Sequence, residues 1–209
     1  MNKPIIIIGN GGHALVLTEI LMLNHREIIG YTAPSKENNL FGLSYLGSDD
    51  IISTYDTNQI ELVLGIGSIQ PNNIRMKIFQ HFKKLGYHFA ECIHPTAIIS
   101  STAIIQEGVQ VMAGAIIQPF VHIKQNVIIN TGVQIDHECK VGEHVHLAPG
   151  TILSGNVKVA RNVHIGTGTK IIQSIVVGEN SMIAAGSVVV NNISINSKVM
   201  GVPAKEVEE

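Results

Sequence analysis

The sequence predicts a Rossmann-like α/β domain over residues 1–90, followed by an all-β parallel β-helix over residues 91–209 that ends in a short tail. Two observations predict this organisation. Strand patterns alternate with helical patterns near the N-terminus, and aliphatic residues then recur at every sixth position. The composition agrees, because 33 Ile and 20 Val residues accompany only 9 aromatic ones.

The N-terminal elements follow one another in the order of a small parallel α/β domain. We expect strands at residues 4–9, 28–32 and 61–67, a helix at 14–23 and an amphipathic helix at 73–85. The apolar side of the second helix is predicted to carry Ile74, Ile78, Phe79 and Phe82.

A glycine-rich turn, G-N-G-G-H, joins the first strand to the first helix. Backbone N–H groups at such a helix N-terminus can approach a phosphate, which makes Gly11, Gly12 and His13 candidate substrate contacts. Gly67, after the third strand, is a candidate for a second, backbone-lined wall of the same nucleotide site. The turn departs from the dinucleotide pattern, and no acidic residue ends the second strand. A nucleotide other than a dinucleotide therefore remains open, as does a plain turn without a ligand.

The six-residue period runs without exception through eighteen positions, from Ile93 to Ile195. Small or β-branched residues fill the fifth position of each hexad. This period fits short strands that turn a corner after each hexad, with Gly or Asn where the corner needs a positive φ. In the hexapeptide-repeat proteins that this period resembles, three hexads make one coil, which implies six coils over residues 93–200. Residues 18 apart would then be neighbours, which places His137 beside Gly155 and His146 beside His164.

This pattern resembles the hexapeptide-repeat, left-handed β-helix family. Four motifs narrow the resemblance to the sugar acetyltransferases that modify sialic acids or nucleotide-linked 4-amino sugars: G-N-G-G-H, I-N-T-x-x-x-I-D-H-E-C, G-E-x-x-H-L-A-P-G and the closing G-V-P-A-K. The resemblance implies a homotrimer with acetyl-CoA bound between adjacent β-helices, and it supplies the left hand of the coil.

The resemblance also implies roles for individual residues. His137 would be the general base and Glu138 would modulate it. His146 would lie near the acetyl thioester, and Gly155 would donate its N–H to the thioester carbonyl. Asn130 matches an asparagine of the active-site region, and Lys170 is a candidate contact for a coenzyme A phosphate.

The expected function is acetyl-CoA-dependent N-acetylation of a 4-amino group on a nucleotide-linked sugar, without a metal. O-acetylation of a sialic acid and a non-catalytic scaffold are the alternatives. A zinc carbonic anhydrase on the same fold is disfavoured, because no two histidines of the repeat segment have the H-x-x-x-x-H spacing of its zinc ligands. A net charge of −2 disfavours nucleic-acid and anionic-membrane partners. Two cysteines and no apolar run of membrane length lead us to expect a cytoplasmic protein.

Overall fold

The computed structural model describes the chain except residues 1–2, 72 and 208–209. Its N-terminal part is a parallel sheet in the order β3-β2-β1-β4, with β1 (Ile5–Ile8), β2 (Ile28–Thr32), β3 (Tyr45–Gly47) and β4 (Glu61–Leu64). Helices α1 (Gly12–Leu23) and α2 (Asn73–Lys84) confirm the two predicted helices, whereas β3 and the 3₁₀ helix η1 (Asp49–Thr54) were not predicted. No helix in the described ranges is long and apolar enough to cross a membrane.

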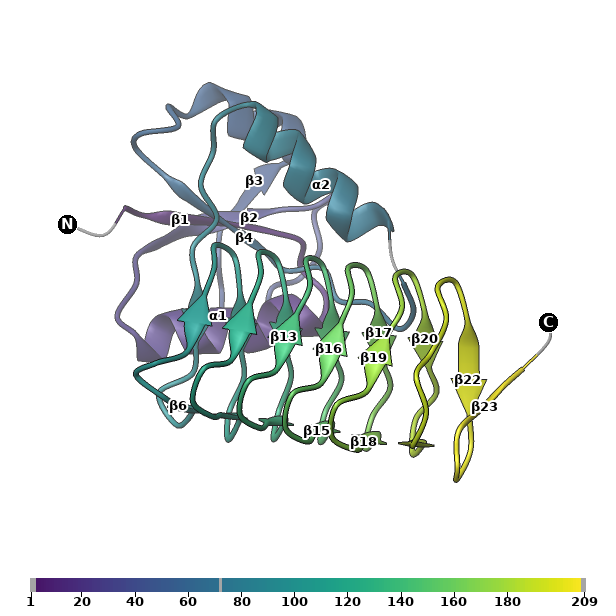
Figure 1. Cartoon of the computed structure of the whole chain (residues 1–209). Helices are drawn as coiled ribbons and strands as arrows, with labels where there is room; N and C mark the ends of the chain where they lie inside the picture. Colours follow the sequence, from purple (N-terminus) through teal and green to yellow (C-terminus); the bar gives the residue numbers. More distant parts are fainter. Residues whose placement is uncertain (1–2, 72, 208–209) are drawn as a thin grey trace.

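The two faces of this sheet bury different neighbours. Because side chains alternate along a strand, Ile5 and Ile7 of β1 pack with α1, and Ile6 and Ile8 pack with α2 and η1. The α1 layer also packs on the first coils of the β-helix, through Cys92, Met112 and Ile128. Figure 1 shows α1 against the coils and α2 on the other side of the sheet, where α2 also contacts the corners of the coils through Arg75 and Phe79.

The rest of the chain is the predicted parallel β-helix, with three sheets that we call its first, second and third faces. The first face contains β5 (Cys92–Ile93), β8 (Gln110–Val111), β11 (Ile128–Ile129), β14 (His146–Leu147), β17 (His164–Ile165), β20 (Met182–Ile183), β22 (Lys198–Met200) and the antiparallel β23 (Lys205–Glu206). The second face contains β6 (Ile98–Ile99), β9 (Ile116–Ile117), β12 (Gln134–Ile135), β15 (Ile152–Leu153), β18 (Lys170–Ile171) and β21 (Val188–Val189). The third contains β7 (Ile104–Ile105), β10 (His122–Ile123), β13 (Lys140–Val141), β16 (Lys158–Val159) and β19 (Val176–Val177).

The eighteen-residue coil is confirmed by the strand register. His146 pairs with His164, and Ile135 pairs with Leu153 one coil further on. The hexad aliphatics from Val111 to Val189 are buried in one continuous core. From Gly108 to Gly186 every sixth residue has a positive φ, which turns the chain at each corner.

The last coil departs from the predicted period. Val177 bridges Ile193 and Ile183 pairs with Val199, so this coil has sixteen residues rather than eighteen. Ile193 therefore takes the inward place predicted for Ile195, which is 67% exposed. The aliphatic at position 195 satisfied the six-residue count without belonging to the core.

Candidate functional site

A cavity of about 800 Å³ lies between the α/β domain and the first face of the β-helix. It brings together five predicted substrate residues and one predicted cofactor residue: Gly11, Gly12, His13, Gly67, Asn130 and His146. The segment between β4 and α2 forms another wall, from Gly65 to Pro71. Ile74, predicted on the apolar side of α2, instead lines this cavity and is 60% exposed.

The glycine-rich turn opens onto this cavity. Helix α1 begins at Gly12, with Gly11 as its N-cap, and a side chain at either position would meet nothing within 4 Å. The first N–H groups of a helix have no partner within the helix, and they carry its partial positive charge. The turn can therefore receive an anionic group, such as a phosphate.

His13 is a neutral side chain held by the β-helix. Its Nε2 lies 2.7 Å from Oε1 of Gln110, whose Nε2 donates to the carbonyl oxygen of Leu64. Since Oε1 can only accept, His13 carries its proton on Nε2 and presents Nδ1 as an acceptor. Burial lowers the pKa of His13 to about 4, which keeps the ring neutral near pH 7.

His146 lies where the two parts of the protein meet. Ser68 Oγ is 3.1 Å from its Nδ1, and Asn130 Nδ2 is 3.2 Å from its Nε2. Its ring stacks edge-on against His164, with centroids 5.0 Å apart. Burial, aided by His164 and Arg75, lowers the pKa of His146 to about 3. His146 is therefore a hydrogen-bonding group near neutral pH, not a proton carrier.

His137 stands at the corner between β12 and β13, with its ring on Gly155. An added Cβ at Gly155 would lie 2.6 Å from Cε1 and Nε2 of that ring. Oε2 of Glu138 is 3.0 Å from His137 Nδ1. This contact fixes the proton on Nδ1 and leaves the Nε2 lone pair free to act as a base. Asp136, the other flanking acid, accepts the backbone N–H of His137 at 2.8 Å and does not hold the ring.

The backbone N–H of Gly155 is the second feature of this corner. The carbonyl of Gly155 accepts from Ser174, but in the described part of the chain its N–H has no assigned acceptor. A free N–H next to an imidazole with an available lone pair can stabilise a developing oxyanion while the ring takes up a proton.

Within one chain the predicted site residues form two groups. His137 and Glu138 meet Gly155 where the second and third faces join, and they do not line the cavity on the first face. His146, expected near the acetyl thioester, lies with the candidate substrate residues within one chain. Lys170 is exposed on β18 of the second face. Sequence reasoning missed Gln110, a single polar residue without a motif, and it placed Ser68 only in a backbone-lined wall without predicting its side-chain contact with His146.

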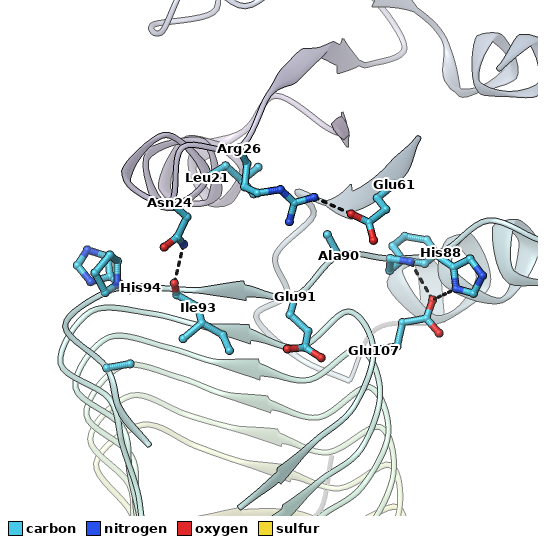
Figure 2. A pocket seen from close by; sticks show the side chains of 13 residues that line it. Leu21, Asn24, Arg26, Glu61, His88, Ala90, Glu91, Ile93, His94 and Glu107 are labelled. Carbon is cyan, nitrogen blue, oxygen red and sulfur yellow. Dashed lines mark hydrogen bonds and ion pairs between the residues drawn. The ribbon is translucent and has the colours of Figure 1, made fainter. Parts of the chain in front are cut away.

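A different cavity, also about 800 Å³, is lined by none of the predicted site residues (Figure 2). It lies where the α/β domain meets the first coil. Its charged groups are largely paired with each other, with Arg26 2.6 Å from Glu61 and His88 3.6 Å from Glu107. Among the described residues, no group of three or more His, Cys, Asp or Glu side chains is placed to hold a metal ion.

Residues 4–82 match the family model of the PglD N-terminal domain. The acetyltransferase domain of PglB from Neisseria gonorrhoeae FA1090 is 32% identical with a TM-score of 0.93, over 99% of this chain and 100% of that one. The chain belongs to the hexapeptide-repeat sugar N-acetyltransferases. Another relative is PerB from Caulobacter crescentus, in complex with CoA and GDP-perosamine, at 32% identity and a TM-score of 0.91 over 99% of this chain and 98% of that one.

A more distant structure shares the fold of these N-acetyltransferases. WeeI from Acinetobacter baumannii AYE is 20% identical, with a TM-score of 0.69 over 99% of this chain and 100% of that one. Both the N-terminal sheet and the β-helix thus lie within the region that shares its fold with that structure.

Proposed function

We propose that this acetyltransferase transfers the acetyl group of acetyl-CoA to the 4-amino group of a nucleotide-linked amino sugar. The observation that carries the proposal is the arrangement of His137, held by Glu138, over the free N–H of Gly155. The gonococcal PglB domain is known in complex with acetyl coenzyme A and the Caulobacter protein with CoA and GDP-perosamine, which supports both substrates.

The chemistry is direct transfer. Nε2 of His137 takes a proton from the sugar amine as the amine nitrogen bonds to the thioester carbonyl carbon. The carbonyl oxygen becomes an oxyanion, which the N–H of Gly155 stabilises. The C–S bond then breaks, and the thiolate of CoA leaves and takes up a proton. Glu138 stabilises the imidazolium that exists between these steps. On the second face, Lys170 would pair with a phosphate of CoA.

The acceptor would bind in the cavity on the first face, with its phosphates at Gly11, Gly12 and His13. Gly67 and Asn130 would bound the sugar end, beside His146. Since His137 does not line this cavity, we propose that a neighbouring copy supplies it within a homotrimer. Mixed trimers of His137→Ala and His13→Ala chains should then regain activity that neither variant has alone.

An acceptor screen tests the proposed function. CoA thiol release is measured with UDP-linked and GDP-linked 4-amino sugars and with free sialic acid. An amide product survives hydroxylamine, whereas the ester formed by O-acetylation is cleaved. We expect His137→Ala to lower turnover by about 10² or more. His122→Ala, which removes an exposed histidine of the third face, is the matched control and should keep full activity. Transfer to sialic acid alone, or wild-type turnover in His137→Ala, would refute the proposal.

A further inference from the structure

A fully buried arginine lies behind the acceptor cavity. Arg75, in the first turn of α2, is 1% exposed. Its Nη2 donates to the backbone oxygen of Asn126 at 3.1 Å and to Oδ1 at 2.9 Å. Its buried Nε–H has no hydrogen-bond partner among the described residues. The guanidinium thus contacts a neutral amide and retains an unsatisfied donor.

No carboxylate of the described chain compensates this charge. The ion pairs of the described residues join other groups, and the titratable neighbours that sense Arg75 are His13, His144 and His146. Burial first, and then the charge of Arg75 with other contacts, lowers the pKa of these histidines to about 4, 4 and 3. Burial lowers the pKa of Arg75 itself to about 9, which leaves it protonated near neutral pH.

An uncompensated buried charge opposes folding, and an apolar side chain could join α2 to the β-helix without that cost. The position of Arg75 indicates where the missing negative charge belongs. Its chain neighbour Ile74 lines the acceptor cavity, and two of the three histidines that sense its charge, His13 and His146, line the same cavity. The open helix N-terminus at Gly11 and Gly12 faces this cavity as well.

We propose that Arg75 is the buried counter-charge for the pyrophosphate of the nucleotide-linked acceptor, which it attracts through the cavity wall without touching it. This inference rests on the proposed function and specifies how its acceptor site recognises charge. The low polarisability of the protein between them preserves the attraction, and salt screens a buried charge less than an exposed one.

Nucleotide affinity tests this role by calorimetry with UDP and GDP on the intact protein. Arg75→Met removes the charge and keeps an apolar stem, and we expect it to weaken binding of the preferred diphosphate by about tenfold or more. Arg75→Gln, which keeps a donor for Asn126, should weaken nucleotide binding by the same factor. If Arg75→Met does not fold, Arg75→Gln takes its place in the test. Acetyl-CoA affinity is the internal control and should stay within threefold of wild type.

Asn126→Gly separates charge from anchoring. It removes the side-chain partner of Arg75, keeps the charge, and suits the positive φ at position 126. We expect nucleotide affinity within threefold of wild type. If Asn126→Gly binds the nucleotide as weakly as Arg75→Met does, Arg75 acts as a mechanical anchor and the inference is overturned. Unchanged nucleotide affinity in both Arg75→Met and Arg75→Gln would also overturn it. Should the wild-type protein bind neither UDP nor GDP, the proposed acceptor fails instead.

Discussion

Gly155→Ala is the substitution that most directly tests the contact between His137, the proposed base, and Gly155, the proposed oxyanion donor. Gly155 does not have a positive φ, so the backbone itself accepts alanine. The obstacle is the ring of His137, because the new Cβ would lie 2.6 Å from both Cε1 and Nε2. Carbon atoms that are not bonded pack at about 3.5–4.0 Å, so the ring must move by roughly 1 Å.

A displacement of about 1 Å at a reacting group can lower turnover by about 10². We therefore expect Gly155→Ala to reduce the initial rate of CoA thiol release by about that factor. Gly114→Ala is the matched control: its φ is +67° and an added Cβ meets nothing within 4 Å. It should cost about 1–2 kcal/mol of stability through backbone strain and leave turnover intact.

A double-mutant cycle isolates the contact. Once His137→Ala has removed the ring, Gly155→Ala should no longer lower the melting temperature. Wild-type turnover in Gly155→Ala would refute this reasoning, as would an equal loss of stability with and without the ring.

Three other predictions concern the site, the buried histidines and the last coil. Glu138→Gln should lower turnover about tenfold because it removes the charge that stabilises the His137 imidazolium. Asp136→Asn should keep turnover within twofold of wild type, because Asp136 accepts only the backbone N–H of His137. Equal effects of the two substitutions on the rate of thiol release would contradict these roles. Burial lowers the pKa of four folded-state histidines from 6.5 to about 4 or below, so only the unfolded chain gains their protons as pH falls from about 6.5 to about 4. These four are His13, His144, His146 and His164. The free energy of unfolding should fall in that window by up to about 1.4 kcal/mol per pH unit for each histidine. Thermal melts should show that the stability of His164→Leu depends less on pH than the stability of the wild type does. Ile193→Ala should cost about 2 kcal/mol in denaturant unfolding and Ile195→Ala less than about 0.5; similar costs, which the uninterrupted period predicts because it turns both side chains inward, would contradict this.

The β-helix could be predicted because its coil repeats one physical requirement, an inward aliphatic every six residues. The same simplicity explains the error in the last coil, where Ile193 and Ile195 both suit a β-strand and only closure of the chain end decides between them. Strand β3 was missed because three half-buried residues carry no clear alternation.

Sequence motifs could nominate candidate site residues, but they could not predict contacts that only the fold assembles. The glycine turn and the residues around His137 are contiguous in sequence, so a local pattern was enough to nominate them. Arg75 instead interrupts an apolar helix face and reads as a solvated residue, yet tertiary packing buries it completely. The distance in the fold between His137 and the acceptor cavity depends on which face each strand occupies, which no local pattern specifies.

The backbone conformation at Glu138 lowers the stability of the fold at a residue whose side chain contacts His137. Its φ of +61° lies in the left-handed region that the corners of this β-helix mostly give to Gly or Asn. A side chain of this kind costs about 1–2 kcal/mol there, and the fold retains it where it orients His137. Glu138→Gly should therefore give a more heat-resistant and slower enzyme, so selection for thermal tolerance alone would tend to remove the glutamate from the proposed catalytic corner.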